Sequence, residues 1–485
     1  MKKIPKCMST QHPDNVNTPF FAKNGALSCE EEVQEAYYAF SHLGCDEQMW
    51  DCEGKEVDNF VVKKLLTKYK NYFKENKLGE DVFLTLRVPN PNIERAEAKI
   101  LLETLESIPR SFDASKIFYG EDISPIFEVI LPMTTSSKSL DRIYSYYKNF
   151  VIGKQNQTFL NDDITIAKWI GEFKPKEINV IPLFEDKNHL LAAHKITEEY
   201  IQNKDIDHQR VFLARSDPAM NYGLINAVIL NKIALKNLQS TSENLNVDIY
   251  PIIGIGSAPF RGNLNPDNVE RVLKEYPSAH TFSIQSSFKY DNGPEKVKKA
   301  LKTIENNKKS QAQDIDEEQY IPLIEKYALE YQKQLQKLAN IINKVAKNVP
   351  NRRKRKLHIG MFGYSRNLNG VSLPRAISFT CALYSIGLPP EVLGINALGN
   401  NMEEIYNVYE NFEIDLIDTL KYINFDNPYL DPKIVQTIND LDLDFQLNSE
   451  HKKATDNILA VIGKKRDNDI IENILRAANT RNFLG

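Results

Sequence analysis

The sequence predicts an α/β protein built as a (β/α)8 barrel, with additional helices at both ends of the chain. Eight runs of strand length can be counted, and helical sequence separates most of them, which is typical of parallel strands joined by helical crossovers. Most of these runs end in a charged, hydroxyl-bearing or glycine-rich segment. Barrel enzymes build their sites from the carboxyl ends of many strands, whereas a doubly wound sheet concentrates its site at one switch point. We therefore expect a barrel whose site draws on several strand ends.

The expected strands are spread over most of the chain. They lie at residues 82–86, 116–120, 126–132, 178–184, 210–214, 249–253, 280–285 and 357–361. We expect one large catalytic domain in three parts, with a loop and helices over 1–80, the barrel over 81–388 and further helices over 389–485. The apolar residues of 29–51 recur at helical spacing, and the segment 294–348 has the pattern of two helices rich in lysine, glutamate and glutamine.

The composition argues against several classes of function. Of the 485 residues, 42% are hydrophobic and 26% charged, and the net charge of −4 argues against general binding to nucleic acid or anionic membranes. No apolar run reaches the roughly 20 residues that a bilayer span needs, and no apolar stretch follows the first lysines as it would in a secretory signal. The five cysteines lack any CxxC spacing, so we expect reduced thiols in a cytoplasmic protein.

Two neighbouring strands near the middle of the chain each end on a carboxylate. The run INVIPLF leads into Glu185, and RVFLA leads into Asp217 within a small turn. The helical stretch between them, about 25 residues, has a natural length for a crossover joining parallel neighbours, so both carboxylates should lie at the same edge of the barrel. Hard oxygen ligands placed in this way suit Mg²⁺ or Mn²⁺ held together with an anionic substrate. The alternative of equal weight is that each acidic residue merely caps the helix after its strand.

Arginines also follow the predicted strands. Arg87 comes directly after the strand 82–86, Arg261 lies in the glycine-rich loop GIGSAPFRGNLNP, and Arg366 and Arg375 flank a loop rich in glycine and asparagine. Beside two carboxylates, such a set favours a pocket for a di- or trianion plus a metal ion, with simple solvent exposure as the alternative for the last two. The glycine-rich loop (254–266) is either a mobile loop that closes over substrate or a plain surface loop.

Two further segments carry residues of interest. In STQHPDN, His12 precedes a proline and so lies in a constrained loop, although the residues alone favour an ordinary surface histidine. The basic run NRRKRK (351–356) lies between a predicted helix and a predicted strand, and we expect a solvated linker there rather than a site for nucleic acid or phosphate.

Several motifs, in one colinear order, resemble those of the phosphoenolpyruvate carboxylases of the archaeal type. STQHPDN and DEQMWDCEGK (46–55) carry the likeness first, and it extends over nearly the whole chain. Compared with the longer carboxylases of bacteria and plants, TQHP resembles TAHP, PLFE matches PLFE, and SDPA with Gly223 resembles SDSAKDAG. Further similarities lie at Leu86-Arg87, Phe288-Lys289-Tyr290, Ser365-Arg366, Arg375-Ala376-Ile377 and Arg481-Asn482.

The resemblance implies a barrel of the phosphoenolpyruvate/pyruvate kind and a homotetramer. It also implies the conversion of phosphoenolpyruvate and bicarbonate to oxaloacetate and phosphate, through carboxyphosphate and the enolate of pyruvate. By this likeness Glu185 and Asp217 are ligands of Mg²⁺ or Mn²⁺, and His12 is the proton-handling base. The expected catalytic and substrate-binding side chains are Arg87, Arg261, Arg366 and Arg375, joined in substrate binding by Gln285.

The chain departs from the longer enzymes at two places. Their FHGRGGSIGRGG loop is replaced by GIGSAPFRGN, with one arginine and no histidine, and Met220 stands where they have a lysine. The sequence is also compatible with two other functions. One is a metal-dependent lyase or aldolase of the same barrel superfamily acting on 2-oxo or 3-hydroxy acids, and the other is a non-catalytic protein that uses 294–356 as a basic helical platform.

Overall fold

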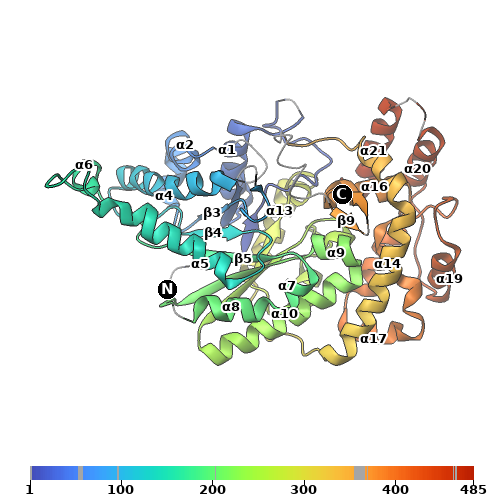
Figure 1. Cartoon of the computed structure of the whole chain (residues 1–485). Coiled ribbons are helices and arrows are strands. Elements are labelled where there is room, and N and C mark those ends of the chain that lie inside the picture. Colours follow the sequence, from blue (N-terminus) through green and yellow to red (C-terminus); the bar gives the residue numbers. More distant parts are fainter. Residues whose placement is uncertain are drawn as a thin grey trace.

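Eight parallel strands close into a barrel in which each strand pairs with the next along the chain and the last pairs with the first (Figure 1). The computed structural model describes the chain except residues 1–2, 24, 53–57, 96–97, 203, 354–365, 369, 463 and 465–466, and describes only the backbone of 366–368. The barrel strands are β1 (Cys7–Ser9), β2 (Glu47–Asp51), β3 (Phe83–Arg87), β4 (Glu128–Leu131), β5 (Asn179–Phe184), β6 (His208–Ala214), β7 (Asp248–Gly254) and β8 (Thr281–Ile284). The predicted (β/α)8 barrel is confirmed.

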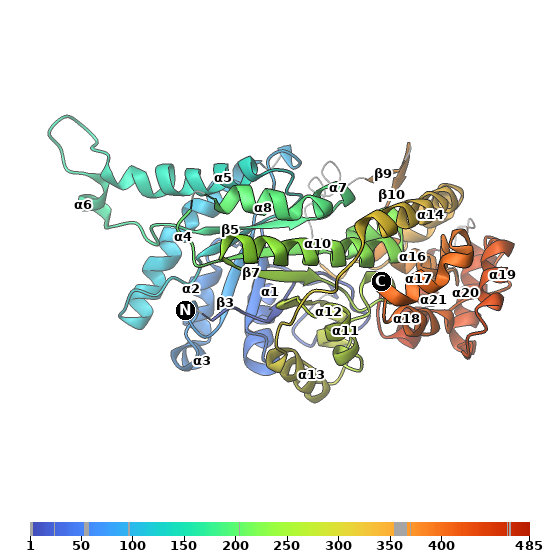
Figure 2. The same cartoon turned by 90° about the horizontal axis from the view of Figure 1, so that it is seen from below.

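Helices surround the barrel and continue beyond it on one side (Figures 1 and 2). Those of the barrel are α1 (Cys29–Tyr38), α2 (Val61–Lys68), α3 (Lys70–Glu75), α4 (Ala98–Tyr119), α5 (Ser137–Tyr146), α6 (Ile166–Ile170), α7 (Lys187–Leu191), α8 (Ala193–Ile201), α9 (Ser216–Tyr222), α10 (Leu224–Leu245), α11 (Val269–Glu275), α12 (Ser286–Tyr290) and α13 (Pro294–Asn306). The long α14 (Glu317–Ala346) leads to a hairpin of β9 (Arg366–Leu368) and β10 (Val371–Leu373). The chain finishes with α16 (Ala376–Ser385), α17 (Met402–Val408), α18 (Phe412–Leu420), α19 (Pro432–Asp440), α20 (Ser449–Val461) and α21 (Asp467–Arg481).

Some of the expected strand positions differ from those in the structure. Strands β1 and β2 lie before residue 81, where the sequence predicts only a loop and helices, whereas β3 to β8 lie within the predicted range 81–388 and end at Ile284. The predicted strand 116–120 is instead the end of α4, where Ile117 is 86% exposed. The predicted strand 357–361 lies outside the described residues. β1 has only three residues and β2 carries two acidic side chains, so neither shows a usual strand pattern.

The acidic side chains of β2 are accommodated because the barrel interior contains their partners. At the end where the strands begin, Arg210 of β6 donates to both carboxylate oxygens of Glu47 at 2.7 Å and to Glu128 of β4 at 3.1 Å. All three side chains are almost completely buried. Above them the interior is filled by Met8, Met49, Ile130, Ile181, Leu183, Phe212, Ala214 and Ile252. The barrel is therefore closed at its base and open only toward the carboxyl ends of its strands.

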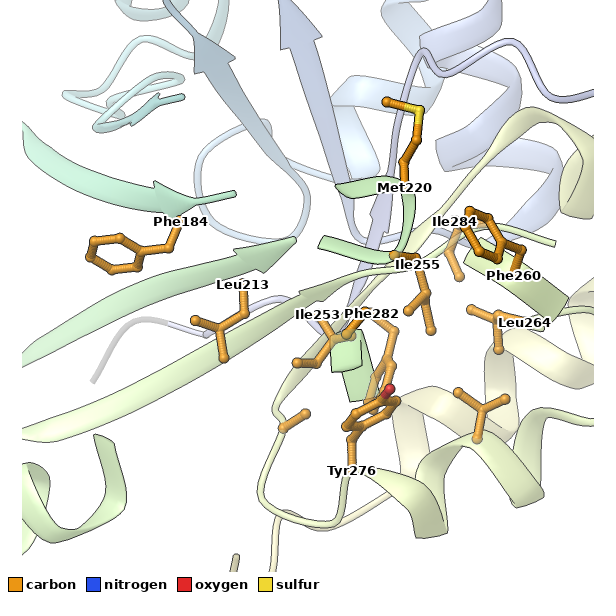
Figure 3. Packing of buried hydrophobic residues seen from close by; sticks show 14 of the residues in the cluster. Phe184, Leu213, Met220, Ile253, Ile255, Phe260, Leu264, Tyr276, Phe282 and Ile284 are labelled. Carbon is orange, nitrogen blue, oxygen red and sulfur yellow. The ribbon is translucent and has the colours of Figure 1, made fainter. Parts of the chain in front are cut away.

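The outward side chains of the strands pack under the helices. On β6, Val211 and Leu213 belong to the outer cluster while Phe212 belongs to the inner one, as the alternation of a strand requires. Figure 3 shows part of the outer cluster, which includes Phe260 and Leu264 of the loop after β7. Within the described part of the chain no single helix is long and apolar enough to cross a membrane. One bent pair of described segments meets the length and composition test: α16 with Pro390–Ala397, at an angle of 91°. Most of the residues in α16 are buried inside the protein.

Candidate active site

The carboxyl ends of the strands surround a cavity of about 250 Å³. Seven of the eight predicted site residues line this cavity: His12, Arg87, Glu185, Asp217, Arg261, Gln285 and Arg375. The eighth, Arg366, begins β9, and its side chain lies outside the described residues. The cavity is also lined by Asp51, Ser216, Arg352, Arg353 and Leu484, none of which had been assigned to the site. Most of these residues come from or directly follow strands, and the others come from the segments after α14.

Glu185 directly follows β5 and is turned into the cavity rather than onto the next helix. Its Oε2 accepts a hydrogen bond from the main-chain N–H of Met133 at 2.6 Å. Met133 has a φ of 51°, a left-handed conformation that is uncommon for a residue with a side chain. The residue that caps α7 is Asp186, which accepts from the N–H of His189 at 3.2 Å. The helix-cap alternative is therefore wrong for Glu185.

Asp217 lies near the start of α9 but is not the residue that caps this helix. It lies in the first turn of α9, whose N-cap residue is Arg215, so its negative charge is favoured by the amino end of that helix. It also lines the same cavity as Glu185. No group of three or more His, Cys, Asp or Glu residues suited to a metal ion occurs among the residues that the structure describes. Two carboxylates, with further places filled by water and substrate oxygens, are the donor set that Mg²⁺ usually takes in proteins, so this pair fits a hard divalent cation.

Arg87 is held by a carboxylate from the neighbouring strand. Its Nε and Nη2 donate to the two oxygens of Asp51 at 3.1 and 2.7 Å. The main-chain N–H of Asp51 in turn donates to the side chain of Gln11 at 2.9 Å, next to His12. The sequence motif DEQMWD contained Asp51, but nothing in its local pattern assigned a role to this residue.

Arg261 is almost completely enclosed, with 2% of the residue exposed. It donates to Ser216 at 3.1 Å, to Gln285 at 2.6 Å, to the main-chain oxygen of Gly485 at 2.7 Å and to Asp14 at 3.4 Å. Burial lowers the pKa of this arginine, and Asp14 opposes the shift. Gly256 leaves the required room, because a Cβ there would lie 2.9 Å from a guanidinium nitrogen of Arg261.

The loop that carries Arg261 is part of the protein interior. Ile255, Ala258 and Phe260 are completely buried, and the N–H of Phe260 donates to Glu391 at 2.6 Å. Asn263 donates to Asp415 at 2.7 Å, which ties the loop to α18. Neither the mobile-loop nor the surface-loop interpretation describes this segment, since it is packed between the barrel and the carboxyl-terminal helices.

His12 lies in the cavity and not on an open surface loop. Its Nδ1 forms a hydrogen bond with Oγ1 of Thr10 at 2.9 Å, and its main-chain oxygen accepts from the N–H of Ser286 at 3.2 Å. The main-chain oxygen of Thr10 accepts from Nζ of the buried Lys289 at 2.9 Å. The hydrogen bond to Thr10 therefore holds the imidazole ring through Nδ1. Nε2 is the other nitrogen of the ring.

The basic run after α14 was expected to be solvated, and this expectation is wrong for its described arginines. Arg353 is 4% exposed, donating to Glu35 at 2.6 and 2.8 Å and to Glu32 at 3.2 Å. Arg352 donates to the main-chain oxygens of Asn15 and Val16, beyond His12. Burial opposes the ionisation of Glu35, but the charges of Arg353 and Lys289 outweigh it and lower the pKa of this carboxyl. Residues 354–356 lie outside the described residues.

The end of the chain completes the wall of the cavity. Arg481 is buried and donates to the main-chain oxygens of Phe483 and Leu484 at 3.1 and 2.9 Å, so it shapes the last turn of chain rather than facing the cavity. Leu484 lines the cavity, and its N–H donates to the main-chain oxygen of Asp14 at 2.7 Å. A Cβ on Gly485 would lie 2.1 Å from the main-chain oxygen of Ile377, so only glycine fits against the start of α16.

Comparisons with known proteins agree with one another. A family model described as phosphoenolpyruvate carboxylase matches residues 4–485. The chain is 57% identical over 484 residues to the phosphoenolpyruvate carboxylase of Methanothermobacter thermautotrophicus and 57% identical over 486 residues to that of Methanospirillum hungatei. It is 44% identical over 504 residues to that of Halobacterium salinarum. In all three pairs the match covers 100% of both chains.

Two solved structures are more distantly similar. An HpcH/HpaI aldolase from Desulfitobacterium hafniense has a TM-score of 0.34 at 13% identity, over 62% of this chain and 93% of the other. The magnesium/glyoxylate complex of malate synthase from Haloferax volcanii has a TM-score of 0.39 at 9% identity, over 66% of this chain and 80% of the other.

Proposed function

Because the chain belongs to the phosphoenolpyruvate carboxylase family, an enzyme family of the carboxy-lyase kind, we propose that its cavity binds phosphoenolpyruvate and bicarbonate and forms oxaloacetate and phosphate. The observation that carries the assignment of residues is the meeting of two carboxylates, one histidine and several arginines at the strand ends of one barrel. Each of these side chains meets a separate demand of the reaction.

The first demand is neutralisation of a highly charged substrate. Phosphoenolpyruvate carries a phosphate and a carboxylate, and guanidinium groups bind such oxygens in pairs of parallel hydrogen bonds. We assign Arg87, Arg261 and Arg375 to these anionic groups, together with Arg366 on the strength of the family likeness. Gln285 accepts a hydrogen bond from Arg261 and so orients this arginine as well as facing the cavity.

The second demand is a divalent cation, for which Glu185 and Asp217 are the proposed ligands. Mg²⁺ or Mn²⁺, when bound, supplies positive charge that stabilises the enolate and the phosphoryl group. Met133 supports this role for Glu185, because its N–H donates to Oε2 and fixes the direction in which the carboxylate points. The arginines must then compensate the phosphate charge that the cation leaves uncovered.

The third demand is a base for the second half of the reaction. Attack of bicarbonate on the phosphoryl group gives carboxyphosphate and the enolate of pyruvate. We propose that Nε2 of His12 takes the proton of carboxyphosphate, which then separates into CO₂ and phosphate. The enolate carbon forms the new bond to CO₂. Water must be kept out at this point, since protonation of the enolate gives pyruvate instead.

Formation of oxaloacetate from phosphoenolpyruvate, with and without bicarbonate and with and without Mg²⁺, tests the proposed function. We expect turnover only when both are present, followed through malate dehydrogenase and NADH. Turnover that is independent of bicarbonate would instead favour a lyase or aldolase of 2-oxo or 3-hydroxy acids. The non-catalytic platform predicts no turnover under any of these conditions and strand-end charges that are dispensable for the protein.

Three further properties belong to the same proposal. We propose a cytoplasmic enzyme of small-molecule substrates, which the five cysteines without CxxC spacing support. We propose that it acts without nucleic acid or membrane, in line with the net charge of −4. Finally, we propose four copies in the assembly, on the basis of the family likeness alone.

A further inference from the structure

A segment between α5 and β5 leaves the barrel and forms a projecting arm, defined here as residues 153–177. Figures 1 and 2 both show this arm, with α6 near its tip, extending past the barrel helices on the side away from the carboxyl terminus. Gly485 contacts Arg261 in the cavity, so the arm points away from the site. No residue of the arm is buried. A segment of this length without a core of its own gains little stability from burial.

The arm nevertheless carries large apolar side chains. Those exposed by nearly half or more are Phe159 (49%), Leu160 (72%), Ile164 (45%), Trp169 (65%) and Ile170 (57%), with Phe150 (65%) at its base. Phe159 and Trp169 meet edge to face, with their ring centroids 5.1 Å apart. Since large side chains of this kind bury about 150–250 Å² each, the six together expose roughly 600 Å². That area approaches the ~800 Å² that each partner contributes to a stable protein interface.

The charges of the arm indicate what covers this surface. Its four lysines (154, 168, 174 and 176) are balanced by four carboxylates (162, 163, 172 and 177), so its net charge is zero. An arm that bound nucleic acid or an anionic membrane would carry an excess of positive charge. Three of these charges already pair within the chain: Lys154 with Glu106, Lys174 with Asp122 and Glu177 with Lys148. The arm therefore has no strong excess of one sign that would repel a second copy of itself across a two-fold axis.

Ion pairs tie the arm to the end of α4, which carries a further exposed apolar side chain. Lys174 of the arm forms an ion pair with Asp122, which also pairs with Lys116 at 2.8 Å, near the end of α4. Ile117, the next residue, is 86% exposed. The arm and the end of α4 therefore each carry exposed apolar side chains and are joined by ion pairs, and apolar residues beside charged ones are the usual anatomy of a protein interface.

We propose that this surface is a two-fold contact between two copies of the chain, in which each arm packs against the arm and the end of α4 of the other copy. The contact lies on the side of the barrel where the strands begin, so it joins two barrels without covering either cavity. This inference does not depend on the reaction, because it concerns a surface remote from the site.

Sedimentation of the full-length protein tests the proposal. Leu160→Ser combined with Trp169→Ser should halve the particle mass of the wild-type protein, because both side chains are exposed in a single copy and needed only at the contact. Leu329→Ser on α14 is the matched control, since Leu329 is 69% exposed and distant from the arm in sequence. The control should keep the wild-type mass. A wild-type monomer, or an arm variant of unchanged mass, would overturn the proposal.

Cross-linking and lipid binding give independent outcomes. Leu160→Cys should form a disulfide-linked pair of chains under mild oxidation. Leu329→Cys contains the same native cysteines and should not form such a pair. Equal cross-linking of both variants would contradict the contact. Vesicles containing 30% phosphatidylserine should not sediment the wild-type protein. Sedimentation that the two serine changes abolish would assign the arm to a membrane and overturn the proposal.

Discussion

Asp51 and Arg87 are register partners at the ends of β2 and β3, and the Asp51 carboxylate accepts two hydrogen bonds from the Arg87 guanidinium. A bidentate pair fixes the plane of the guanidinium, and with it the direction of the donors that the carboxylate does not use. Both residues line the cavity. The strand that supplies Asp51 thus positions the arginine that the next strand presents to the cavity.

Arg87→Lys should lower kcat/KM for phosphoenolpyruvate by about 10- to 100-fold, because lysine keeps the charge but cannot make the paired hydrogen bonds. Steady-state kinetics at saturating bicarbonate measures this change. Arg476→Lys is the matched control on the exposed side of α21 and should leave kcat/KM unchanged. Wild-type kinetics in Arg87→Lys would remove Arg87 from substrate binding.

Asp217→Asn and Glu185→Gln should each weaken Mn²⁺ binding, because either change removes one of the two proposed carboxylate ligands. Titration of the protein with Mn²⁺, followed by electron paramagnetic resonance without substrate, measures affinity separately from activity. Asp186→Asn is the control for a neighbouring carboxylate, since Asp186 caps α7 and is not among the residues that line the cavity. It should cost no more than about 1 kcal/mol of stability and leave Mn²⁺ affinity unchanged. Equal affinities in all three variants would refute the ligand assignment.

His12→Asn should separate the two halves of the reaction. Bicarbonate-dependent release of phosphate should persist, while oxaloacetate formation falls and pyruvate replaces it, since the base acts after phosphoryl transfer. The ratio of oxaloacetate to phosphate, measured in one reaction mixture, is the decisive quantity. A ratio equal to that of the wild type would exclude His12 from the second half.

The stability of the protein should depend on the ionisation of Glu391. Burial raises the pKa of this carboxyl to about 7, and its Oε1 accepts hydrogen bonds from the N–H of Phe260 and the hydroxyl of Tyr384, both at 2.6 Å. Because the pKa is higher in the folded than in the unfolded chain, the contribution of Glu391 to stability is full below pH 4.5 and is lost as the pH rises toward 7.

Glu391→Gln removes this proton equilibrium while keeping an acceptor for Phe260. The unfolding free energy of the variant relative to the wild type should therefore rise between pH 5 and pH 7, by roughly 3 kcal/mol at most. Denaturant unfolding of both proteins across this range measures the difference. Parallel pH profiles would show that Glu391 does not titrate between the folded and unfolded states.

The parts of the site that could be predicted from the sequence are those marked by a pattern of neighbouring residues. Glu185 and Asp217 follow long apolar strands, so the barrel and its carboxylates could be inferred from chain order alone. β1 and β2 could not, because a three-residue strand and a strand with two acidic side chains lack the usual pattern. Glu47 is tolerated in β2 only because Arg210, 163 residues later, meets it inside the barrel.

The class of fold, the family likeness and most strand-end residues follow from the amino-acid sequence alone, because they depend on hydrophobic spacing and on motifs of a few neighbouring residues. The contact of Asp51 with Arg87, and that of Gly485 with Arg261, 224 residues away in the sequence, are established by the folded structure. The folded structure also shows that Arg353 is buried against Glu35 and that the loop after β7 is enclosed. These relationships join charges that lie far apart along the chain, and the energy of such a pair depends on distance and burial, which folding alone sets.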